Sequence, residues 1–181
     1  MLPWEVGGGG GLRVLDLSRN DLSLRSPGAP GRAAAEDAVA LLCDALSTGG
    51  CCGVTELSLA GNYLKGEGAA AVGAMLRANG VLTALDLSDN RLGNGDEATL
   101  LELASGVGEQ PRRALRRLDL RANAICFNDA SRVLARRLLG HSKLAMINGQ
   151  RVTAEQTAAA QSGADMDPEV RGRIFDVLWR E

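Results

Sequence analysis

The sequence predicts an α/β solenoid, with short parallel strands on a concave face, helices on a convex face and a right-handed winding. Three observations support this fold class. The pattern LxxLxLxxNxL, with Val or Ile allowed at either end, occurs four times. Successive copies start about 28 to 42 residues apart, and each interval carries apolar residues at helical spacing.

The four copies predict four strands, each followed by a turn. They occupy residues 12–22, 54–64, 82–92 and 115–125. Leucines alternate with other residues, as in Leu85-Asp86-Leu87, so we expect one buried and one exposed side of each strand. An Asn amide can donate to and accept from turn backbone, so we expect the asparagines to stack in one structural ladder. These residues are Asn20, Asn62, Asn90 and Asn123.

The segments between the strands predict helices on the opposite side. Apolar residues recur there three and four positions apart, which indicates one buried helical face. The residues concerned are Val39, Leu42, Cys43 and Leu46, then Val72, Met75 and Leu76, then Leu100, Leu103, Ala104 and Val107, and finally Leu134 and Leu138. A stretch rich in Pro and Gly predicts an inserted loop over about residues 23–35.

The segment GEGAAAVGAMLRANGVLTALDLSDNRL, residues 66–92, resembles the ribonuclease-inhibitor type of leucine-rich repeat. The Ran GTPase-activating protein and sensor domains of innate-immune receptors have repeats of this type. KLAMINGQRVTAEQ, residues 143–156, resembles the terminal cap of smaller leucine-rich repeat proteins, and Thr153 with Gln156 forms a capping-box pattern. The resemblance implies a repeat domain over residues 12–152 and a helical cap and tail over 153–181, and the glycine run marks a Gly-rich segment over residues 1–11.

The tail contains a second predicted helix. Asp167 and Pro168 are typical of a helix start, and the residues that follow form one apolar face. Two interpretations stay open, a helix that folds back as an extra cap and a free segment that docks on a partner. At the other end of the chain, Leu2, Trp4 and Val6 either cover the first coil or leave it open to something upstream.

Composition excludes several classes of protein. The chain has 181 residues, 45% hydrophobic content and a formal net charge of −2, which is typical of a folded domain and gives no overall attraction to nucleic acid or membrane. No stretch reads as a signal peptide or a membrane helix. We therefore expect a cytoplasmic protein, with nuclear or axonemal placement also open, and four reduced cysteines.

Catalytic and cofactor motifs are not found in the sequence. His141 is the only histidine, and we expect it to have a structural role at the end of a helix. The cysteines lack the spacing of a metal site, and the glycine run at 7–11 is not followed by the Lys-Ser/Thr of a phosphate loop. We expect no enzyme activity, no cofactor and no metal.

The exposed positions of the strands are the candidate binding site. We expect a polar column made of Asp16, Ser58, Asp86, Asp119 and Asn148. A basic cluster comprises Arg112, Arg113, Arg116, Arg117 and Arg121. The hypothetical protein-binding residues are Arg13, Asp16, Ser18, Glu56, Ser58, Asp86, Ser88, Arg116, Arg117, Asp119 and Arg121.

These features favour a non-catalytic adaptor or recognition module that binds a protein partner through the concave sheet and adjacent loops. Two alternatives remain. One is a regulator of an enzyme, of the inhibitor or GTPase-activating type, and the other is RNA binding through the Arg112–Arg121 cluster. We expect a chain that is monomeric or part of a larger assembly, without membrane contact.

Overall fold

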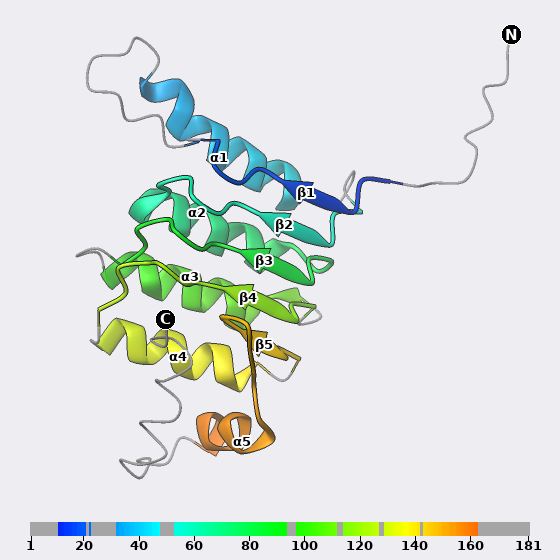
Figure 1. The fold of residues 1–181 in the computed structure, drawn as a ribbon, viewed down its shortest axis with the longest axis vertical. Coiled ribbons are helices and arrows are strands. Elements are labelled where there is room, and N and C mark those ends of the chain that lie inside the picture. Colours follow the sequence, from blue (N-terminus) through cyan, green and yellow to red (C-terminus); the bar gives the residue numbers. More distant parts are fainter. Residues whose placement is uncertain are drawn as a thin grey trace, which may run out of the picture.

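The fold consists of one sheet covered on one side by helices (Figure 1). The structure, a computed structural model, describes residues 11–20, 22, 32–47, 53–93, 97–111, 114–126, 129–141 and 143–162. The segment 1–10, residues 23–31, Cys51, Cys52, Arg112, Arg113 and the tail 163–181 lie outside the described residues, and so do the expectations placed on them.

In the part of the chain that the structure describes, the sheet has six strands in chain order. Five are parallel and one is antiparallel. The strands are β1 (Val14–Asp16), β2 (Glu56–Ser58), β3 (Ala84–Asp86), β4 (Arg117–Asp119), β5 (Met146–Ile147) and the antiparallel β6 (Gln150–Arg151). Their leucines fall in one register, with Leu15, Leu57, Leu85, Leu118 and Ile147 side by side.

Among the described residues, four helices stack behind the parallel strands and a fifth follows the last hairpin (Figure 1). They are α1 (Arg32–Ser47), α2 (Lys65–Ala78), α3 (Glu97–Glu109), α4 (Asp129–Gly140) and α5 (Ala154–Ser162). The predicted inserted loop was too long at its C-terminal end, because residues 32–35 belong to α1. None of the described helices is long and apolar enough to cross a membrane.

The core lies between the sheet and the helices. Leu57 and Leu85 are 3% and 2% exposed, and the helix residues Leu76, Leu103 and Leu134 are fully buried in the same apolar cluster. Each buried leucine side chain contributes about 1.5–3 kcal/mol to folding. Thin layers of leucine therefore join each coil to the next.

Asparagine side chains hold the turns after β2, β3 and β4. Asn90 is fully buried, and its Oδ1 accepts hydrogen bonds from the backbone N–H groups of Asn62 and Leu64 in the preceding coil, at 3.0 and 3.3 Å. Its Nδ2 donates to the carbonyl of Leu59 in that coil and to the carbonyls of Leu87 and Ser88 in its own. One side chain thus satisfies five backbone groups of two adjacent coils.

The same arrangement recurs in the neighbouring coils. Asn62 accepts from the N–H groups of Asn20 and Leu22, and Asn123 accepts from those of Asn90 and Leu92. Asn20, in the first coil, is exposed, and its Nδ2 donates to the carbonyl of Ser18 at 3.2 Å.

Buried polar side chains also occur at the other end of the coil, where the helices end. Asn79, Gln110 and His141 directly follow α2, α3 and α4, and all are 2–3% exposed. Asn79 donates to the Leu46 carbonyl in the coil before, and Gln110 donates to the Leu82 carbonyl at the start of its own coil. The Asn79 amide therefore joins two helix ends as the turn asparagines join the strand ends.

Two glycines set the closest approach between helices. A Cβ placed on Gly106 of α3 would lie 2.3 Å from the Gly73 carbonyl oxygen of α2, and one placed on Gly73 would lie 2.6 Å from the Glu102 carbonyl oxygen. Backbone therefore meets backbone where α2 and α3 cross, and a larger residue has no room. The small residues of α2 thus permit close packing between helices.

A hairpin and a short helix follow the last parallel strand. The turn between β5 and β6 places Asn148 and Gly149 at φ 52° and 76°, and the chain reverses there. Thr153 and Gln156 then form reciprocal hydrogen bonds at the start of α5, from Thr153 N–H to Gln156 Oε1 at 2.8 Å and from Gln156 N–H to Thr153 Oγ1 at 3.2 Å.

We predict that Gly106→Ala lowers the free energy of unfolding by about 1–3 kcal/mol, because the new methyl group overlaps the Gly73 backbone. Gly108→Ala is the matched control, since its Cβ meets only the flexible Arg137 side chain at 3.2 Å and a helix favours Ala over Gly by up to about 1 kcal/mol. Urea denaturation measures both. Equal stability of the two variants would contradict the tight crossing.

We also predict that Asn90→Ala costs about 3 kcal/mol or more, because it leaves buried backbone groups of two coils without partners. Asn20→Ala is the control and costs about 0.5–1 kcal/mol, since that side chain is exposed and bonds one carbonyl. Thermal and urea unfolding compare them. A similar loss in both variants would mean that the buried turn does not depend on Asn90.

Candidate functional site

The side of the sheet that faces away from the helices carries two rows of side chains, which we call the sheet face. The first row is Val14, Glu56, Ala84, Arg117 and Met146, and the second is Asp16, Ser58, Asp86 and Asp119. Strand alternation places both rows outward while the leucines point inward. A groove of about 350 Å³ crosses this face from β1 to Gly149.

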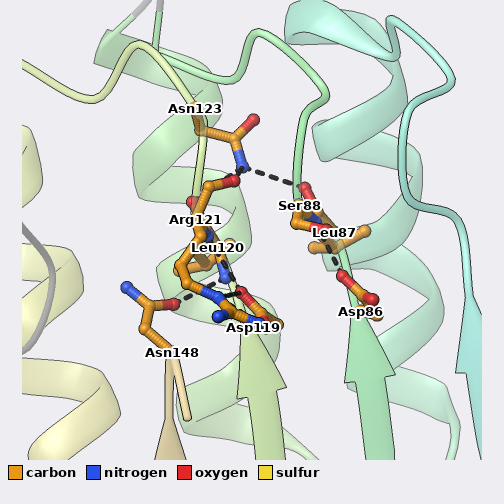
Figure 2. Close-up of polar contacts among 8 residues, drawn as sticks. All are labelled: Asp86, Leu87, Ser88, Asp119, Leu120, Arg121, Asn123 and Asn148. Atoms are coloured by element: carbon orange, nitrogen blue, oxygen red, sulfur yellow. Dashed lines mark hydrogen bonds and ion pairs between the residues drawn. The ribbon is translucent and has the colours of Figure 1, made fainter. Parts of the chain in front are cut away.

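The aspartates of the second row each accept a hydrogen bond from the backbone two residues later. Asp16 Oδ1 accepts from the Ser18 N–H at 2.9 Å. Asp86 Oδ1 accepts from the Ser88 N–H at the same distance, as Figure 2 shows. Asp119 Oδ1 accepts from the Arg121 N–H at 3.0 Å. The Ser18 hydroxyl also donates to Asp16, and these bonds lower the pKa of that carboxyl. The aspartates of the second row therefore bind backbone N–H groups of the turns that follow the strands.

Two ion pairs lie on the sheet face, one between β2 and β4 and one at the end of β4. Arg117 reaches Glu56 at 3.0 Å, although β3 lies between their strands. Ala84 is the residue of β3 in that register, and its short side chain leaves room for the pair. The ion pair of Glu56 and Arg117, which we call the strap, therefore links β2 to β4 across β3.

The second ion pair lies within one coil. Arg121 Nε is 3.0 Å from both oxygens of Asp119 (Figure 2), and this contact, with a smaller contribution from Asp86, raises the pKa of the guanidinium. Two arginines of the predicted basic cluster, Arg117 and Arg121, are thus paired with carboxylates of the same face. Arg116 is exposed beside them.

One predicted member of the polar column lies elsewhere. Asn148 is only 6% exposed, and its Oδ1 accepts a hydrogen bond from the Leu120 N–H at 2.7 Å (Figure 2). The assignment of Asn148 to the outward column was wrong, because the chain turns at this residue and directs its amide toward β4. The remaining predicted face residues of the first coil, Arg13 and Ser18, lie at the two ends of β1.

An aromatic contact at the turns was not predicted. The Arg91 guanidinium carbon lies 4.5 Å from the centre of the Tyr63 ring, and Tyr63 is 41% exposed. Both residues have positive φ, 57° and 53°. Each directly follows the asparagine of its copy, so an alignment of the copies by their asparagines would have placed Tyr63 beside Arg91.

The described residues contain no group of three His, Cys, Asp or Glu side chains placed to hold a metal ion. Cys43 is 3% exposed, and burial raises the pKa of its thiol to about 12. Cys126 is exposed after β4. The face offers charged and apolar contacts rather than an activated nucleophile.

Comparisons with known protein families match two of the four copies of the pattern. A family model described as a leucine-rich repeat matches residues 11–32, and a second model with the same description matches residues 78–96. A search of curated proteins finds no significant match to the chain.

We predict that iodoacetamide at about pH 8 alkylates Cys126 and leaves Cys43 unmodified in the folded protein. Burial keeps Cys43 in its thiol form and out of reach of the reagent. Digestion and mass spectrometry measure the modified fraction, and a urea-unfolded sample is the control in which both react. Equal labelling of the two in the folded state would contradict the packing of α1.

Proposed function

We propose that the chain is a leucine-rich repeat protein, as the two family matches support, and that it is a non-catalytic module that binds a protein partner through the sheet face and the adjoining loops. Solenoids of this kind present extended surfaces, and leucine-rich repeats commonly mediate contacts between proteins. Within the proposal, the repeats are of the ribonuclease-inhibitor type, the winding is right-handed, and the face is concave because helices are wider than strands.

The observation that carries the proposal is the groove across the sheet face. Its lining combines apolar side chains, such as Val14 and Met146, with the charged pairs of Glu56 and Asp119. Val14 is 59% exposed and Met146 is 37% exposed, so both ends of the first row offer apolar area. Such a mixture of apolar anchors and fixed charges is typical of a protein-binding surface.

The ion pairs favour selectivity for a partner of matched charge. Arg117 and Arg121 are already oriented by their carboxylates, so a partner meets guanidinium groups of defined position. The same pairing reduces the support for RNA binding, since these arginines are neutralised within the face and no aromatic side chain belongs to either row. An enzyme-regulating role is supported only by the resemblance of the repeats.

Charge reversal on the sheet face tests the proposal. We predict that Asp86→Arg and Arg117→Glu each reduce the capture of one common set of protein partners by about tenfold or more. Proximity labelling in cells followed by quantitative mass spectrometry measures the capture.

The matched control is Arg132→Glu on α4, which breaks an exposed pair with Asp129 on the helical side. We expect it to retain all partners. Circular dichroism verifies that the variants are folded. If both sheet-face variants keep every partner of the unmodified protein, the sheet face is not the binding site.

A further inference from the structure

The groove across the sheet face is lined by an excess of negative charge. Its charged lining consists of four carboxylates and one guanidinium, a net formal charge of −3, from Asp16, Glu56, Asp86, Asp119 and Arg117. Arg13 and Arg116 precede β1 and β4 and are not part of this lining. A groove of this charge attracts a cationic group and repels the phosphates of a nucleic acid.

Two of the four carboxylates are not neutralised by the protein itself. The strap pairs Glu56, and Arg121 pairs Asp119. Asp16 and Asp86 form no ion pair within the part of the chain that the structure describes. Asp86 adds only a small Coulombic attraction to Arg121, whose hydrogen bonds go to Asp119. The uncompensated negative charge of the groove therefore lies on β1 and β3.

Both of these carboxylates are held in position by the turns that follow their strands. Asp16 and Asp86 each accept a backbone N–H through Oδ1, and the Ser18 hydroxyl donates to the same oxygen of Asp16. Oδ2 of each carboxylate has no hydrogen-bond partner among the described residues, so it can accept from a donor outside the chain. The Ser18 hydrogen bonds also lower the pKa of Asp16, which keeps this carboxyl ionised at neutral pH.

Ser58 lies between the two uncompensated carboxylates. The strand register places it beside Asp16 on one side and beside Asp86 on the other. Neighbouring strands are about 4.8 Å apart, so the carboxylates lie about 10 Å from each other and a cation over Ser58 lies about 5 Å from each. At that distance both carboxylates attract the cation. Val14, on the same side of β1, is 59% exposed and can cover the apolar stem of a lysine or arginine.

We propose that the groove binds a basic segment of a protein partner, with a lysine or arginine side chain of that segment over Ser58, between Asp16 and Asp86. The inference rests on the proposed function and names the chemistry of the partner. Charge complementarity carries it, because the charges that the groove leaves without a partner are negative. An acidic segment or a nucleic acid does not fit the same place.

Two labelled peptides test the charge preference directly. One alternates Lys with Val and the other alternates Glu with Val, so the two differ in the sign of their charge. We expect the full chain to bind the Lys peptide at least about tenfold more tightly than the Glu peptide, as fluorescence anisotropy measures. We also expect the affinity for the Lys peptide to fall as salt is raised. Failure to bind the Lys peptide, or equal affinity for the two peptides, overturns the proposal.

Neutral variants locate the contact. The double variant Asp16→Asn, Asp86→Asn keeps the size of both side chains, and we expect it to bind the Lys peptide at least about tenfold more weakly. The matched control, Glu102→Gln with Asp129→Asn, removes the same charge from exposed carboxylates of α3 and α4 and leaves the affinity unchanged. Circular dichroism verifies that both proteins are folded. Equal weakening in the two proteins would show attraction to net charge alone and would overturn the contact at Ser58.

The partners captured in cells separate this inference from the proposed function. We expect the partners that Arg117→Glu loses to be lost also by the Asp16→Asn, Asp86→Asn variant. If that variant keeps all of them, the sheet face binds proteins but not through a basic side chain at Ser58. If neither variant loses a partner, the sheet face is not the binding site, and the proposed function fails together with the inference.

Discussion

Hydrogen bonds between asparagine side chains and the backbone of the adjacent coil make the short strands of this protein possible. A strand of three residues satisfies few backbone groups, and the chain leaves the sheet at once into a buried turn. A buried N–H without an acceptor costs about 1–3 kcal/mol, and each turn contains several. The amides of Asn62, Asn90 and Asn123 supply both the acceptor and the donors at that place. The leucines can then pack on the side of the sheet that faces the helices. The sheet face carries side chains that are not part of the core.

The side chains of the sheet face are nevertheless oriented by local hydrogen bonds. The aspartates of the second row accept from the amide two residues on, so each carboxylate has a fixed orientation at the strand end. Arg117 and Arg121 are then held by carboxylates of the same face. Because these pairs are exposed, they contribute little to stability and are available for exchange with the charges of a partner. These hydrogen bonds and ion pairs are made by strand and turn residues and not by helix residues. The core and the sheet face of one coil therefore depend on different contacts.

The repeat pattern was enough to predict the parallel strands and the helices beside them, and family models described as leucine-rich repeats match two of the four copies. The prediction from the repeat pattern was wrong at two places where the chain departs from the repeat. The helix start at Arg32 was missed because Pro and Gly precede an alanine run without apolar periodicity. Asn148 was placed outward because the pattern assumes a continuing strand, whereas the chain reverses there. The strap between Glu56 and Arg117 depends on the size of the residue between them, which spacing alone does not reveal.

The asparagine bonds have a direction along the chain. Asn62 serves the Leu17 carbonyl and the Asn20 and Leu22 amides, all of which precede it, and Asn90 and Asn123 also serve the coil before their own. A coil leaving the ribosome therefore has unfinished turns until the following coil emerges. Assembly during synthesis must lag behind translation by one repeat, and trimming the chain from its C-terminal side exposes defects that trimming from its N-terminal side does not.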